Sequence, residues 1–257
     1  MNRREALGAA LGVEGRKLLA ARVPLVAAAL LIVGVVAICL VVVVTAASGP
    51  SALIAKLGPL AGRGGWPGLT SAAMQVTAAG GFLACGTVAG WLFGREFAEG
   101  TVAGLFALPV RRADVAMGKL LVYLAWALVV AMLLPAALVV AGLAAGFGAP
   151  GSEELAALAR LAVLMPLTAL MATPAALIAT LARGLLGGIA ATVVLVASAQ
   201  VFVLSGVGAW FPPAAPALWA MAPDQANTTA TLVALWLPVV SAVLIVVAWR
   251  RLQLDRS

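Results

Sequence analysis

Six apolar stretches of membrane-spanning length constrain the fold of this chain more than any other feature of its sequence. A helix needs about 20 consecutive apolar residues to cross a bilayer. Runs of this kind cover residues 24–47, 69–93, 119–145, 155–182, 187–210 and 229–249. Apolar residues make up 64% of the chain and charged residues 10%, a balance that excludes an ordinary soluble domain. The sequence therefore predicts an all-α integral membrane protein with six transmembrane helices.

The polar ends of the chain complete the plan of a single transmembrane domain over residues 1–257. It has an interfacial helix at 1–23, a six-span bundle at 24–249 and a short tail at 250–257. The first segment places leucines near one helical face, where Glu14 also lies, and a solvated charged tail is the alternative. On a packed helix Glu14 would need a basic partner, either Lys17 or a basic residue of the segment 94–119.

The distribution of Lys and Arg predicts the orientation in the membrane. One side of a six-span chain holds thirteen of them: Arg3, Arg4, Arg16, Lys17, Arg22, Arg95, Arg111, Arg112, Lys119, Arg183, Arg250, Arg251 and Arg256. The other side holds three: Lys56, Arg63 and Arg160. Because basic residues concentrate on the cytoplasmic side, both termini are predicted to be cytoplasmic. The cations are spread along membrane edges, so nothing supports nucleic-acid binding.

A charged segment at 94–119 separates the second and third spans. It carries seven charges, four basic and three acidic, so it must lie in water at a membrane surface. Gly100 is predicted to break the arriving helix and Thr101 to cap a short amphipathic one, which includes Leu105 and ends at Pro109.

This segment resembles the first cytoplasmic loop of type-2 ABC transporter permeases, the membrane subunits of ABC exporters. That loop carries a Glu, then Glu-Gly-Thr, a leucine-rich turn, a Pro, an Arg and a Lys. The matching residues are Glu96, Glu99, Gly100, Thr101, Leu105, Pro109, Arg112 and Lys119. The family usually has Ser where Arg111 stands, a difference that concerns the fit to the ATPase.

The resemblance implies a coupling helix that docks into a separate ABC ATPase subunit. It also implies a second permease copy or a paralogue as partner, and a multi-pass location in a prokaryotic plasma membrane. ATP and Mg would be bound by the ATPase, with no cofactor in this chain. The family has short re-entrant helices before the last span, and residues 211–228, rich in Pro and aromatic residues, would fit one; an interfacial Pro-rich loop is the alternative.

Small residues and prolines mark further positions inside the spans. Gly86, Gly90 and Gly94 form one stripe and Gly184 with Gly188 another, a spacing that allows close helix approach. Pro135, Pro166, Pro174 and Pro238 are candidate bending points.

Several missing residue types exclude other classes of protein. The chain has no histidine, which excludes Ser-His nucleophile pairs and His-containing metal sites. A phosphate-binding Walker loop is also missing, so the chain is not expected to be an enzyme or to hydrolyse ATP. No Asp, Glu or Lys falls deep in a predicted span, which disfavours an ion-coupled carrier or channel. Energy for transport would then enter through the segment 94–119.

In the resembled family the second and fifth spans line the transport pathway. Gln75, Phe82, Gln200 and Phe202 are therefore candidate wall residues, with ordinary interhelical packing as the alternative. Such a mostly apolar wall would suit an amphipathic or hydrophobic substrate, such as a drug, an antimicrobial peptide or a lipid. The main functional hypothesis is an exporter permease, and the alternative is a non-transporting membrane anchor or sensor that recruits a cytoplasmic partner.

Overall fold

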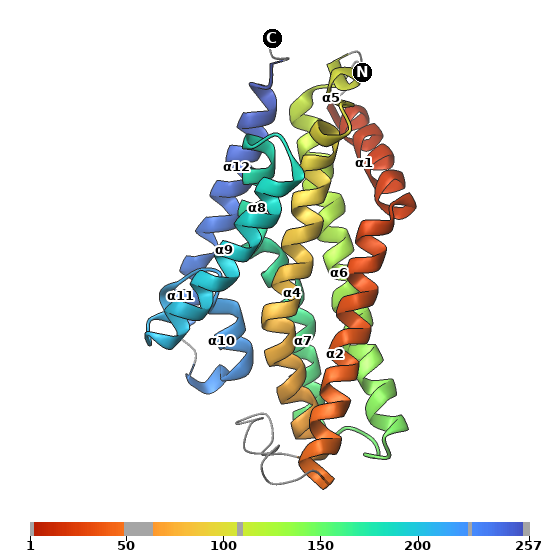
Figure 1. Cartoon of the computed structure of the whole chain (residues 1–257), viewed down its shortest axis with the longest axis vertical. Coiled ribbons are helices and arrows are strands. Elements are labelled where there is room, and N and C mark those ends of the chain that lie inside the picture. The colour runs from red at the N-terminus through yellow and green to blue at the C-terminus, as the bar shows by residue number, and fades with distance from the viewer. Residues whose placement is uncertain (1–2, 49–63, 107–109, 226–227, 254–257) are drawn as a thin grey trace.

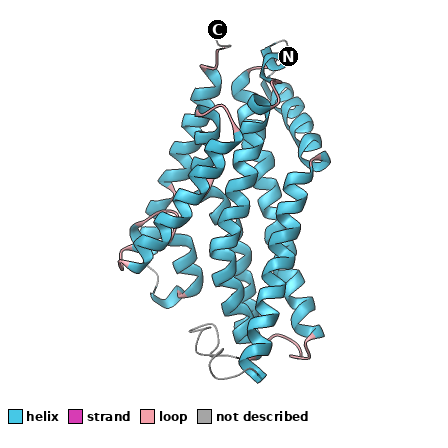
Figure 2. Cartoon of the chain, in the orientation of Figure 1, coloured by secondary structure: helices cyan, strands magenta, loops and turns pink. Residues whose placement is uncertain are grey.

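A computed structural model describes residues 3–48, 64–106, 110–225 and 228–253, and every regular element in these ranges is helical (Figure 2). The longer helices are α1 (Arg3–Ala20), α2 (Arg22–Ser48), α4 (Gly65–Ala98), α6 (Arg112–Ala144), α7 (Ser152–Met171), α8 (Thr173–Leu181), α9 (Leu185–Leu204) and α12 (Trp236–Arg250). The shorter ones are α5 (Val102–Phe106), η2 (Gly208–Trp210), α10 (Ala215–Met221), η3 (Pro223–Gln225) and α11 (Thr228–Ala234). The prediction of an all-helical fold is confirmed.

Six helical stretches in the described residues are long and apolar enough to cross a membrane, as predicted. They run over Arg22–Ala46, Gly65–Ala98, Arg112–Ala144, Ser152–Leu181, Leu185–Leu204 and Leu232–Arg250. The fifth ends earlier than the predicted residue 210, because the backbone of Gly206 has a φ of +80° and turns the chain out of the helix. The sixth joins the end of α11 to α12.

The fourth span is broken near its middle at Ala172. Pro174 lies in the first turn of α8, where it has no N–H to donate to the preceding helix. The Thr173 hydroxyl donates to the carbonyl of Leu170 at 2.7 Å and satisfies one of the acceptors at the break. The fourth span is thus interrupted beside Pro174, whereas Pro135 and Pro166 lie within the uninterrupted helices α6 and α7.

Helix α4 is the central helix of the bundle and contacts α2, α7, α8 and α9 (Figure 1). Its approach to α9 depends on glycine: a Cβ added to Gly188 would lie 2.6 Å from the Cα of Gly90. A Cβ on Gly94 would lie 2.9 Å from the carbonyl carbon of Gly184. The predicted close approach of the two glycine stripes is therefore confirmed.

The outer surface of the bundle is apolar. Large side chains of α2, α9 and α12 are more than half exposed, including Leu30, Val41, Leu186, Leu204 and Val239. A water-soluble protein rarely exposes such continuous apolar area, and this surface fits contact with lipid.

Short and peripheral helices pack on the bundle in two places. Helices α1 and α5 and the last turn of α12 gather at one end (Figure 1). Within the segment 211–228, the described residues form the short helix α10, which packs on α4 and α7. Its residues Ala215, Pro216 and Ala220 are buried.

Candidate functional site

The charged segment between α4 and α6 forms the turn and short helix expected of it. Gly100 has a φ of +68°, a conformation that favours glycine and ends α4 as predicted. The Thr101 hydroxyl, predicted to cap α5, instead donates to the carbonyl of Glu96 at 3.5 Å. Leu105 belongs to α5, whereas its side chain and Pro109 lie outside the described residues.

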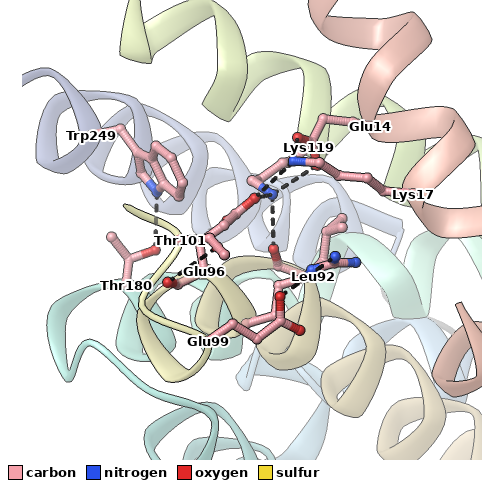
Figure 3. Close-up of polar contacts among 10 residues, drawn as sticks. Glu14, Lys17, Leu92, Glu96, Glu99, Thr101, Lys119, Thr180 and Trp249 are labelled. Atoms are coloured by element: carbon pink, nitrogen blue, oxygen red, sulfur yellow. Dashed lines mark hydrogen bonds and ion pairs between the residues drawn. The ribbon is translucent and has the colours of Figure 1, made fainter. Parts of the chain in front are cut away.

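Below this turn, Lys119 of α6 is enclosed by groups from three other helices (Figure 3). Its side chain has 0% exposure, and its ammonium lies 2.8 Å from Oε2 of Glu14 and 2.6 Å from Oε1 of Glu96. It also donates to the carbonyl of Leu92 at 3.1 Å. The ring of Trp249 in α12 lies 5.7 Å away, at cation–π distance.

Lys17 joins the same group from the partly exposed side. Its ammonium lies 2.8 Å from Oε1 of Glu14 and 3.3 Å from Oε1 of Glu96. Two ammonium groups thus face two carboxylates, and Glu14, Lys17, Glu96 and Lys119 are called the ionic cluster from here on. Glu14 was predicted to need Lys17 or a basic residue of the segment 94–119, and it has both.

The position of Lys119 corrects one prediction. As a coupling residue at the membrane edge it was expected to reach water, but the structure buries it completely. The reason is that α1 lies across α6 at close range, so that a Cβ on Gly118 would be 3.4 Å from the Cβ of Ala10. Glu96 is likewise only 2% exposed, and its Oε2 has no hydrogen-bond partner among the described residues.

The neighbouring charges in the ionic cluster keep Glu14 and Lys17, the two side chains from α1, in their charged forms. Burial alone would raise the pKa of Glu14, but the ammonium groups of Lys119 and Lys17 outweigh burial and hold that pKa below its ordinary value of 4.5. Burial would lower the pKa of Lys17, yet the carboxylates of Glu14 and Glu96 raise it above 10.5. Both groups of α1 are therefore charged near neutral pH.

Docking of α1 should consequently be constant across the neutral range. The stabilisation of docked α1 by Glu14 is present above the pKa of this side chain in the unfolded chain, near 4.5. It is lost as the pH falls through the lower pKa that Glu14 has in the folded protein. The stabilisation by Lys17 is present below about pH 10.5, the pKa of this side chain in the unfolded chain. It is lost as the pH rises through the higher pKa that Lys17 has in the folded protein.

Spin labels on the exposed positions Val13 and Met117 would report the distance between α1 and α6. We expect one distance from pH 6 to pH 9 and a broadened distribution below about pH 4.5. Glu14→Gln should weaken this acid response. A distance that changes between pH 6 and pH 8 in the wild type would contradict the assignment.

Other residues of the segment remain at the surface. The Glu99 side chain is 51% exposed and lies 3.8 Å from the Arg95 guanidinium, while Gly100 and Thr101 are also exposed. Arg112 donates from its guanidinium to the carbonyl of Leu252, beyond α12. The segment therefore has two parts. Its exposed tip consists of Glu99, Gly100 and Thr101, and its base, with Glu96 and Lys119, contacts α1, while Arg112 contacts the residues after α12.

Three of the four candidate pathway residues share one cavity. Gln75, Phe82 and Gln200 line a space of about 260 Å3 between α4, α9 and α10. Phe202 does not line it and stacks on Phe211 with ring centroids 4.3 Å apart. This geometry leaves their role in transport as a prediction.

Comparison with known proteins assigns this arrangement to a family. The family model for the ABC-2 family transporter protein matches residues 21–199, which include α2, the charged segment and most of α9. The chain belongs to this family. No curated protein and no solved structure matches it.

Membership supplies the coarse function. The chain is the membrane permease component of an ABC-2 transporter and lacks ATPase activity. ABC-2 permeases work with an ABC ATPase partner, which handles the ATP. The predicted resemblance of the chain to ABC transporter permeases is thereby confirmed at the level of the family.

Proposed function

We propose that this ABC-2 permease exports an amphipathic or hydrophobic substrate, and that the turn before α5 is its contact with the ATPase. The observation that carries the proposal is the division of the segment into an exposed tip and a buried base. Glu99, Gly100 and Thr101 are exposed, so they are available to a partner. Glu96 and Lys119 are buried, so they act within the permease.

Force applied at the tip would pass directly into the bundle. The tip follows the last turn of α4, and Glu96 in that turn is paired with Lys119 of α6 and Lys17 of α1. Helices α1, α4 and α6 would therefore move with the tip as a unit, because separating any one of them would leave a buried charge without its partner. Arg112 extends the link to the segment after α12, and α5, which includes Leu105, would be the coupling helix.

The orientation in this proposal has both termini and the tip in the cytoplasm of a prokaryotic cell. The thirteen basic residues on that side, against three on the other, support it. The α1 segment would then be the interfacial helix of a single-domain permease that works as a pair, with a second copy or a paralogue. The helix α10 would be the re-entrant element, because it packs on α4 and α7 inside the bundle outline.

The substrate class follows from the cavity between α4, α9 and α10. Apart from Gln75 and Gln200, its lining consists of apolar side chains such as Phe82, Val196 and Leu218. Two amide groups in an otherwise apolar wall suit a molecule with a large apolar body and few polar groups. Drugs, antimicrobial peptides and lipids are of this kind, and Phe202, 40% exposed on α9, would extend the wall.

Charge reversal at the tip tests the ATPase contact. Glu99→Arg should lower the amount of ABC ATPase that copurifies with the permease from native membranes by about tenfold, because a rim charge is replaced by its opposite. Glu153→Arg is the matched control, since Glu153 is exposed and lies in the first turn of α7. Quantitative mass spectrometry of both purifications is the measurement.

Two results would overturn parts of the proposal. Equal ATPase recovery from the Glu99→Arg and Glu153→Arg permeases would remove the tip from the interface. If the complex forms but its ATP turnover responds to no amphipathic compound and vesicles accumulate none, the chain is a non-transporting anchor or sensor.

A further inference from the structure

An apolar groove lies at the elbow where α1 meets α2. Helix α1 ends at Ala20 and α2 begins at Arg22, and the groove between these helices and α6 has a volume of about 350 Å3. Leu18, Leu25 and Val129 are among its lining residues, all of which are aliphatic, Gly, Pro or Trp. Among the described residues, no ionisable side chain lines it.

Of the described residues that line the groove, only Trp126 has a polar side-chain atom, and that atom already has a hydrogen-bond partner. Trp126 lines the groove, and its indole N–H donates to the carbonyl of Pro24 at 3.2 Å. This bond ties α6 to the first turn of α2. The groove therefore offers its occupant mainly apolar contacts.

Two arginines are close in sequence to groove-lining residues at the elbow. Arg16 follows the lining residue Gly15, and Arg22 precedes the lining residue Pro24. Both arginines are exposed, and neither pairs with a carboxylate of the described residues. The nearest carboxylate in sequence, Glu14, is buried against Lys119.

We propose that this elbow binds one anionic phospholipid, with an acyl chain in the groove and the phosphate at Arg16 and Arg22. Guanidinium groups bind phosphate oxygens through paired N–H donors. Because any acyl chain fits an apolar groove in a bilayer, selectivity must come from the headgroup, and two unpaired cations favour an anionic one. The site requires only that the elbow lies at the membrane surface and is independent of the ATPase contact.

The bound lipid would hold α1 in its docked position. Leu18 lines the groove, and its neighbour Lys17 belongs to the ionic cluster. An acyl chain against Leu18 adds contacts that exist only when α1 packs on α6. Lipid composition would thereby influence how firmly the base of the segment 94–119 is held.

The proposal is tested by titrating lipid onto the full-length permease, delipidated in mild detergent, and counting bound lipids by native mass spectrometry. The probes are phosphatidylglycerol and phosphatidylcholine of equal chain length. We expect phosphatidylglycerol to bind more tightly, and Arg16→Gln with Arg22→Gln to weaken its binding roughly 30-fold, from about one kcal/mol for each basic residue. Arg250→Gln with Arg251→Gln, an exposed basic pair at the end of α12, is the control and should change it little.

A second pair of variants tests the groove without changing charge. Ala125 lines the groove and is exposed, so Ala125→Trp should fill it and weaken phosphatidylglycerol binding at least tenfold, by about 1.4 kcal/mol. Leu128→Trp changes an exposed position of α6 that does not line the groove and is the control. Equal effects of both tryptophans, equal effects of both arginine pairs, or equal binding of the two lipids would each overturn the site.

Discussion

Replacing Lys119 by methionine is expected to lower the free energy of unfolding of this permease by about 3–5 kcal/mol, the usual cost of removing one partner from a buried ion pair. The ammonium has 0% exposure and contacts the carboxylates of both Glu14 and Glu96. Methionine has a similar length but no charge, so two carboxylates would remain buried with only Lys17 to balance them. Helix α1 should then detach from α6.

Thermal unfolding in detergent, followed by the loss of monodisperse protein, measures this effect. Lys17→Met is the matched control: its side chain is 29% exposed and Lys119 still pairs with both carboxylates, so a much smaller loss is expected. The triple variant Glu14→Gln, Glu96→Gln, Lys119→Met should recover most of the stability, because the one charge that it leaves in the cluster, the Lys17 ammonium, belongs to a side chain that is 29% exposed and can reach water.

The same triple variant separates stability from function. If the ionic cluster transmits motion from the tip, the triple variant should be stable yet couple ATP hydrolysis to transport poorly. Equal unfolding midpoints for Lys119→Met and Lys17→Met would show that the buried Lys119 contributes no more to the fold than the partly exposed Lys17.

Gly188→Leu is the second substitution with a large expected effect. A Cβ at this position would lie 2.6 Å from the Cα of Gly90 and 3.2 Å from the carbonyl oxygen of Ala175. These neighbours are backbone atoms of α4 and α8, which have no rotamer to change, so α9 must move away as a whole. We expect a loss of about 3 kcal/mol, at the upper end of what overpacking costs.

Gly34→Leu provides the control for this change. Gly34 lies within α2, and a Cβ there meets no atom within 4 Å, so the same substitution should be nearly neutral. Unfolding midpoints of both variants, with transport into inverted vesicles, are the measurements. A Gly188→Leu permease as stable and active as the Gly34→Leu permease would disprove the tight contact between α4 and α9.

The sequence predicted the spans well because each is a continuous apolar run, and composition alone locates such runs. It missed the end of α9, since the apolar residues continue beyond Gly206 while the backbone turns there. The spacing of the glycines predicted that their helices could approach a neighbour closely, but that Gly90 meets Gly188 came only from the structure.

The ionic cluster was predictable only in part. The position of Glu14 on the packed face of α1 showed that it needed a basic partner. Nothing in the local sequence showed that α1 would cover α6 closely enough to bury Lys119, or that Trp249 would lie beside it, since these contacts join residues far apart in the chain. From sequence alone, a charged residue near the end of a span is expected to be exposed to water. Whether another helix covers it depends on how the helices pack.

The interruption at Ala172 divides the fourth span into two helices, α7 and α8. Its second part, α8, is fastened to α12, where the Trp249 indole N–H donates to the Thr180 hydroxyl at 3.3 Å, and it also contacts α9. Because Pro174 leaves the hydrogen-bond ladder incomplete at the joint, rotation there costs less than in an unbroken helix. The fourth span can therefore bend at this joint at a lower cost than within α7.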